Sequence, residues 1–211
     1  MDVNGTDAVH SVVLASVYRV RDPRRMWAQI KARQSGLTAI GAHHAVVYVS
    51  TQQPGLVLVT IGVRHRETVA ELVRSPVIRG WFDVAGVEDI PMVFAGEIVE
   101  KIDVAASPDV PPGVVVAVFA GVDSVAGVVS RMHGDMDRFR NAGVRKLWTY
   151  HALDDPLELL VLQEFDDETN AHRWIEHPDA AADWMRRPEH GRYPPIFVGR
   201  FMDMLTIESA G

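Results

Sequence analysis

Two tyrosines, Tyr48 and Tyr150, are separated by 102 residues, the spacing at which the sequence repeats itself. Each lies in a stretch that is expected to form a strand, and two interpretations are open. In one, the ring packs on a helix and its hydroxyl is hydrogen-bonded at the end of the sheet. In the other, the hydroxyl donates a hydrogen bond to a substrate oxygen, as an enzyme needs in order to stabilise an aromatic enolate. Tyr150 is therefore a candidate catalytic residue and Tyr48 a candidate substrate-binding residue.

His151 is the candidate for proton transfer. The position 102 residues earlier is Val49, so only one of the two repeats carries this histidine. An imidazole can accept a proton near neutral pH, which makes His151 a candidate catalytic base beside Tyr150. The other interpretation is a solvated histidine at a strand end. Alternation along the strand divides its residues between two faces, with Leu147, Thr149 and His151 on one and Trp148, Tyr150 and Ala152 on the other.

Tryptophans are the candidates for a pocket wall. Trp81 and Trp184 each follow a proline that ends a predicted helix, and they match each other between the repeats. They either anchor the core or line a pocket for a small hydrophobic ligand. Together with Tyr48 and Trp148, they are the predicted substrate-binding residues.

Histidines and carboxylates do not assemble into a predicted metal site. His172 and Glu176 are four residues apart on one helix face and His177 follows, but no third ligand can be identified. An exposed helix face is the other interpretation of this cluster. His43 and His44 are adjacent on a predicted strand, so we expect them to point to opposite faces and not to bind one ion together.

These residues belong to a tandem duplication, because the chain can be aligned with itself. The offset is 102 residues from position 11 to position 76, and one inserted residue then makes it 103. The matched pairs include Gly41 with Gly143, Pro54 with Pro156, Leu58-Val59 with Leu160-Val161, Phe94 with Phe197 and Gly96 with Gly199.

Each copy has the pattern of a β-α-β-β-α-β unit. Apolar runs bounded by turn residues predict strands, and helical spacing of apolar residues predicts helices. In the second copy we predict a strand over Val114–Ala120, a helix capped by Asp123 or Ser124 that extends to Phe139 and ends at Gly143, a hairpin of Leu147–Ala152 and Leu157–Phe165, and a second helix after Asp167.

The predicted fold class is α+β, with two tandem ferredoxin-like repeats packing sheet to sheet as an intrachain α/β barrel. Strands such as Val114–Phe119 and Leu56–Val63 are apolar on both faces, which indicates that both sheet faces are buried. Glu97 and Arg200 occupy matching positions with opposite charge, so we expect them to pair across the pseudo-two-fold axis. The predicted organisation is a flexible tail (1–9), a first repeat (10–103), a linker (104–113) and a second repeat (114–209).

Composition excludes several classes of function. The net charge is −7 and lysines and arginines do not cluster, so a nucleic acid is not an expected partner. No apolar run approaches the roughly 20 residues of a membrane helix, and the first residues do not resemble a secretory signal. The chain has no cysteine, which excludes disulfides and thiol chemistry. We expect a cytoplasmic protein that does not bind membranes.

Two stretches resemble the dimeric α/β-barrel superfamily, in particular the antibiotic biosynthesis monooxygenase-like proteins. One is Tyr150–Trp174, with Asp154-Asp155-Pro156 and the strand Leu160–Phe165. The other contains Ser75-Pro76, Trp81, Ala85-Gly86-Val87 and Ile90-Pro91. The resemblance covers nearly the whole chain twice and implies ferredoxin-like halves. It departs from the pattern of the family's oxygenases, because neither Val12–Val20 nor Val114–Val122 contains the asparagine expected on the first strand.

The resemblance implies several possible functions, because this fold carries many activities. The first is a cofactor-independent, monooxygenase-like enzyme for a small hydrophobic or aromatic ligand, in which Tyr150 and His151 orient or deprotonate the substrate and Trp148 and Trp184 line the pocket. The second is a non-catalytic ligand-binding or scaffold protein. The third binds haem, with His177 as its candidate ligand, although Trp174 and His177 are closer in sequence than in the haem-degrading branch. A monomer and a homodimer are both compatible with a duplicated barrel.

Overall fold

The computed structural model describes residues 12–66, 69, 87, 93–106, 113–176 and 196–207. The predicted tail, most of the predicted linker and the candidates Trp81, His177 and Trp184 lie outside the described residues. The first half, up to residue 103, contains β1 (Val12–Arg19), α1 (Pro23–Ala32), α2 (Gln34–Ala39), β2 (Ala42–Ser50), β3 (Leu56–Val63) and β4 (Val93–Asp103). The second half, from residue 114, contains β5 (Val114–Gly121), α5 (Val125–Gly134), α6 (Met136–Asn141), β6 (Val144–Ala152), β7 (Glu158–Phe165), α7 (Glu168–Glu176) and β8 (Ile196–Thr206).

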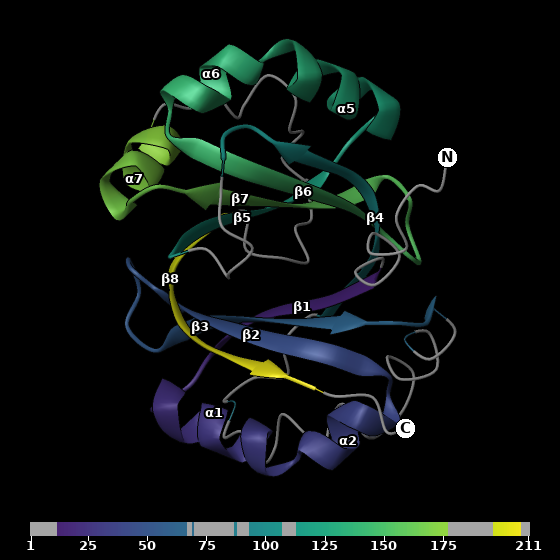
Figure 1. The fold of residues 1–211 in the computed structure, drawn as a ribbon, viewed down its shortest axis with the longest axis vertical. Coiled ribbons are helices and arrows are strands. Elements are labelled where there is room, and N and C mark those ends of the chain that lie inside the picture. Colours follow the sequence, from purple (N-terminus) through teal and green to yellow (C-terminus); the bar gives the residue numbers. More distant parts are fainter. Residues whose placement is uncertain are drawn as a thin grey trace.

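The eight strands form one closed antiparallel ring in the order β1-β3-β2-β8-β5-β7-β6-β4. Each half contributes a ferredoxin-like sheet, and the two sheets are joined at both edges, where β2 pairs with β8 and β4 pairs with β6. Every strand of the first half has its counterpart four places further round the ring. The helices of the two halves lie on opposite outer sides (Figure 1). The α+β class and the duplicated ferredoxin-like order are therefore confirmed.

Local signals account for the ends of the helices. The Asp22 carboxylate accepts hydrogen bonds from the backbone N–H groups of Arg24 and Arg25, and the Ser124 hydroxyl accepts one from Gly127, so Ser124 is the cap of α5. The prediction of one helix up to Phe139 is wrong. The chain leaves the helical conformation at Asp135, directly after Gly134, and α6 is a separate short helix of six residues.

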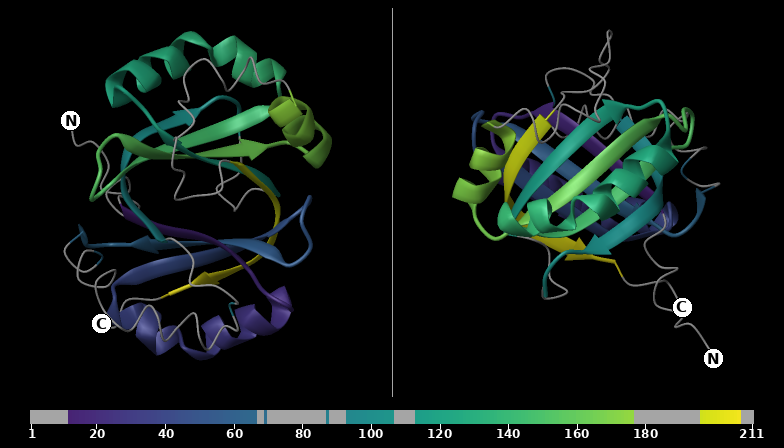
Figure 2. Two further views of the ribbon diagram at one scale, coloured as in Figure 1. Left: turned by 180° about the vertical axis from the view of Figure 1, so that it is seen from behind. Right: turned by 90° about the horizontal axis from the view of Figure 1, so that it is seen from above.

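The last strand of each half closes the ring. β4 and β8 each have 11 residues, longer than the strands beside them, and each begins in its own sheet and ends in the other (Figure 2). Each strand has a bulge where it passes from one sheet to the other. In β4 the register with β6 shifts between Ile98 and Glu100, and in β8 Met202 is the extra residue opposite β2. Alternate residues after the bulge, such as Ile102 on β4 and Leu205 on β8, then face the helices of the opposite half.

The ring creates three cores. Among the residues that the structure describes, the barrel core contains side chains from all eight strands and none from a helix. Each half also has one helix-facing core, between its sheet and its own helices. The first helix-facing core includes Leu14, Val47, Met26 and Trp27; the second includes Val116, Leu147, Met132, Phe139 and Trp174. The barrel core consists of Val13, Ala15, Val46, Tyr48, Leu58, Phe94, Val115, Ala117, Phe119, Tyr150, Ala152, Leu160, Leu162 and Phe197.

One matching polar contact in each half connects its first helix to the strand that enters from the other half. Lys31 of α1 lies 3.0 Å from the Asp203 carboxylate of β8, and His133 of α5 lies 3.4 Å from Glu100 of β4. The two pairs occupy equivalent positions of the duplication. Trp27 also donates its indole N–H to Asp203 at 2.7 Å.

The predicted pairing of Glu97 with Arg200 is wrong. Glu97 pairs with Arg66 at 3.2 Å, and Arg200 pairs with Glu168. Arg66 and Glu168 are themselves equivalent in the two repeats, so the same strand-to-helix ion pair occurs in each half with its charges exchanged. The opposite signs at positions 97 and 200 therefore reflect two separate pairs within the halves.

Gly96 and its counterpart Gly199 allow a phenylalanine ring to fold over the long strand. A β-carbon at Gly96 would clash with the Phe94 ring and would lie 2.7 Å from the carbonyl oxygen of His151. We predict that Gly96→Ala lowers the free energy of unfolding by about 1–3 kcal/mol, because backbone and ring must both move. Gly121→Ala is the control, since nothing lies within 4 Å of its new β-carbon. Equal denaturation midpoints for the two variants would contradict this packing.

The hydrogen bond from Lys31 is the main reason that the pKa of Asp203 is lowered, with further contributions from Trp27 and Met204. A lowered pKa means that this carboxylate stabilises the fold above the pKa it has in the unfolded chain, and that the contribution disappears as the pH falls through its folded value. We predict that the unfolding midpoint of Asp203→Asn depends less on pH than that of the wild type between about pH 3 and 5. Parallel profiles in chemical denaturation would show that the pair does not contribute.

Candidate functional site

The barrel separates the predicted site residues into two groups. Tyr48, Tyr150 and Trp148 face the barrel core, whereas His151 lies on the other face of β6 and points toward the helices of the second half. Tyr150 and His151 are adjacent in sequence, but they cannot contact the same side of one ligand. The structure therefore brings Tyr48 and Tyr150 into one environment and places His151 in another.

The helix-facing surface of the second half carries a row of polar residues, of which the sequence had indicated His151 as a candidate and had not indicated Gln163. This polar row consists of Thr149 and His151 on β6 and Gln163 on the neighbouring strand β7. Thr149 and Gln163 are buried, with 0% and 2% of their surface exposed. The equivalent residues of the first half are all apolar, namely Val47, Val49 and Ile61.

Two atoms of the polar row lack hydrogen-bond partners. Nδ1 of His151 and Oε1 of Gln163 are buried, and no hydrogen bond reaches either of them from the residues that the structure describes. Thr149 differs, because its hydroxyl donates a weak hydrogen bond to the sulfur of Met132 at 3.5 Å. A buried polar atom without a partner costs free energy, so such atoms indicate a ligand or water that completes the hydrogen bonds.

His151 lies at the boundary between the halves. It is directly opposite Glu97 in the ladder between β6 and β4, on the same sheet face, and Glu97 in turn pairs with Arg66. A neutral imidazole in this position can accept a proton from a bound molecule. Gln163 lies opposite Leu147 in the ladder between β6 and β7, four residues along the strand from the position of His151, which is roughly 13 Å. Its amide can hydrogen-bond an oxygen or a hydroxyl at the other end of a ligand that spans this distance. The row thus combines one proton acceptor and two hydrogen-bonding groups on an otherwise apolar surface.

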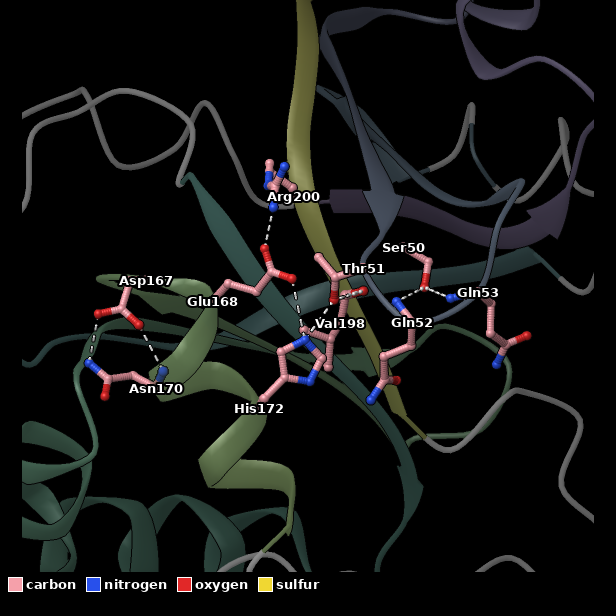
Figure 3. A network of polar contacts seen from close by, with 10 residues as sticks. All are labelled: Ser50, Thr51, Gln52, Gln53, Asp167, Glu168, Asn170, His172, Val198 and Arg200. Atoms are coloured by element: carbon pink, nitrogen blue, oxygen red, sulfur yellow. Dashed lines mark hydrogen bonds and ion pairs between the residues drawn. The ribbon is translucent and has the colours of Figure 1, made fainter.

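His172 belongs to a network that links the halves, shown in Figure 3. Its Nε2 atom lies 3.0 Å from the Thr51 hydroxyl and 3.6 Å from Oε1 of Glu168, which also binds Arg200. Both contacts use the same ring nitrogen, so the arrangement differs from a catalytic triad, in which the acid and the nucleophile bind different nitrogens. The i,i+4 partner of His172 is Glu168, whereas the sequence had suggested Glu176.

The expectation that His43 and His44 point to opposite faces is wrong. The register of β2 shifts between Ala42 and His44, and this bulge brings the two rings within 4.5 Å of each other. Both rings lie where a β-carbon of Gly62 would be, with Nε2 of His43 at 2.6 Å from that position. Within the described ranges, no group of three or more histidine, aspartate or glutamate side chains is placed to hold a metal ion. No described helix is long and apolar enough to cross a membrane.

Comparison with known proteins shows the fold. No family model and no curated protein matches this sequence. An anthrone oxidase-like protein has a TM-score of 0.67 and 11% identity, with 96% of this chain and 97% of that chain covered. A putative monooxygenase from Lactobacillus acidophilus has a TM-score of 0.52 and 9% identity, covering 93% and 95%. The chain has the dimeric α/β-barrel fold.

A heme-degrading enzyme from Listeria monocytogenes has the same fold, with a TM-score of 0.51, 10% identity and coverage of 91% of this chain and 100% of that chain. The predicted resemblance to the dimeric α/β-barrel proteins is therefore confirmed for the fold. Structural neighbours with different names share it, so the function of this chain must be argued from its own residues.

The first half supplies a matched substitution for the polar row. We predict that Gln163→Ile raises the free energy of unfolding of the unliganded protein by about 1–3 kcal/mol, because it removes a buried acceptor without a partner. The residue at the equivalent position, Ile61, is already accommodated in the same sheet geometry. Thr149→Val should gain less, since Thr149 has a partner. A lower denaturation midpoint for Gln163→Ile would contradict this interpretation of the site.

Proposed function

We propose that the chain is a cofactor-independent, monooxygenase-like enzyme that holds a small hydrophobic, aromatic ligand against the polar row of the second half. The observation that carries the proposal is a pair of buried atoms, Nδ1 of His151 and Oε1 of Gln163, that have no hydrogen-bond partner among the described residues. The surroundings suit an aromatic ring, because the second helix-facing core contains Met132, Phe139 and Trp174.

In the proposed reaction, His151 accepts a proton from a methylene group that is activated by a neighbouring aromatic ketone. The resulting enolate transfers electrons to dioxygen. The carbon gains one oxygen atom and becomes a carbonyl, and the other oxygen atom leaves as water with the two methylene hydrogens. Oε1 of Gln163 would accept a hydrogen bond from a substrate hydroxyl, and the Gln163 NH2 group and the Thr149 hydroxyl would donate to a ketone oxygen. Trp184, which lies outside the described residues, stays a predicted wall of this pocket.

The names of the structural neighbours support this class of chemistry. One is called an anthrone oxidase-like protein and another a putative monooxygenase. Anthrone is a fused aromatic ketone with an activated methylene group, so it is a suitable probe. The haem-binding alternative depends on His177, outside the described residues, and stays a prediction.

The test is dioxygen uptake with anthrone as substrate, measured against the protein-free rate. We predict that His151→Val lowers kcat by about 100-fold or more, as expected when a general base is lost. The control is His133→Gln, which removes a histidine of the same half whose side chain is 54% exposed. Full turnover by His151→Val would exclude His151 as the base. Saturable binding of anthrone without uptake above the protein-free rate would instead support the non-catalytic binding protein.

A further inference from the structure

The barrel core contains two tyrosine hydroxyls that the proposed reaction does not use. Tyr48 on β2 and Tyr150 on β6 are equivalent in the duplication and belong to strands on opposite sides of the ring. Only 5% of Tyr48 and 7% of Tyr150 is exposed. Neither hydroxyl makes a hydrogen bond with any residue that the structure describes. Neither hydroxyl oxygen is among the fully enclosed polar atoms without a partner, so each keeps some accessible surface that a ligand atom or a water molecule can reach.

The surroundings of the two hydroxyls are aromatic. The Tyr48 ring lies edge-on to Phe201 with 6.2 Å between centroids, and Phe94 and Phe119 make a similar contact at 5.9 Å. Burial raises the pKa of both tyrosines, and for Tyr48 the Glu164 carboxylate and Tyr150 raise it further. Both hydroxyls therefore remain protonated and can donate hydrogen bonds. Both side chains belong to the barrel core and come from strands on opposite sides of the ring, so they enter the core from facing walls.

The charged groups near the barrel core disfavour an anion. Lys146 on β6 lies between Asp103 on β4 and Glu164 on β7 in one continuous row of the ladder. Its ammonium group is 3.5 Å from Asp103 and 5.5 Å from the centre of the Trp148 ring. The Asp103 side chain is 62% exposed, so the buried charges of this row are Lys146 and Glu164, one of each sign. An additional buried anion would have no cation of its own and would be costly.

We propose that the barrel core binds one small neutral molecule, an aromatic ketone or a similar carbonyl compound, whose oxygen accepts hydrogen bonds from Tyr48 and Tyr150. This site lies on the opposite face of the sheet from the polar row, and it does not depend on the proposed enzyme activity. It uses one residue from each half, so a single half cannot form it.

The experiment uses the full chain with His151→Val and Gln163→Ile, so that the polar row is removed and only the barrel core is tested. The probe is 4-fluoroacetophenone, followed by fluorine NMR, and the matched control ligand is 1-ethyl-4-fluorobenzene, which lacks the oxygen. We expect saturable binding of the ketone. Adding Tyr48→Phe and Tyr150→Phe should weaken it about tenfold or more, as two lost hydrogen bonds imply, and should change the affinity for the hydrocarbon less than about threefold.

Three results would overturn the proposal. The first is no saturable binding of the ketone, which would leave only ordered water for the two hydroxyls. The second is an equal loss of ketone and hydrocarbon binding in the double tyrosine variant. The third is binding that the wild type shows and the His151→Val, Gln163→Ile protein does not. Phenylalanine keeps the ring shape, so we expect the tyrosine variants to fold, and their denaturation midpoints verify this.

Discussion

A single four-stranded sheet with helices on one side has two unpaired edges and one uncovered face. In this protein the exchange of β4 and β8 satisfies both requirements at once. Each long strand leaves its own half, pairs with the second strand of the other and closes the ring, so the uncovered faces become the barrel core. The ring also gives every strand one face toward the barrel core and one toward helices. Which of two environments a side chain enters is then decided by alternation along the strand.

The duplication makes the first half a natural reference for the second. The backbone arrangement and the polar contact between helix and incoming strand occur in both halves, with Lys31–Asp203 matched by His133–Glu100. The helix-facing surfaces have diverged, since the polar row replaces three apolar residues. Buried polar residues with incomplete hydrogen bonds lower the free energy of unfolding, so the polar row is better explained by a function than by a contribution to stability.

Sequence reasoning could reach the repeat, the element order and the fold family, because these depend on apolar periodicity and on glycine and proline at turns. It could not reach the details that depend on pairing between the halves. The bulge at His43 and His44 and the partners of Glu97 and Arg200 are set by register, which neither residue type nor spacing reveals. The opposite faces of Tyr150 and His151 followed from alternation, yet the two had been assigned to one reaction. Gln163 could have been found by comparing the repeats position by position.

A crystal structure of the protein soaked with anthrone tests the central claim most directly. The account predicts density for the aromatic ketone between the helix-facing sheet of the second half and its helices, with the methylene carbon against His151 and the ketone oxygen within hydrogen-bond distance of the Gln163 amide nitrogen. Ligand density against Val49 and Ile61 of the first half, or no ordered ligand in the second helix-facing core, would contradict it.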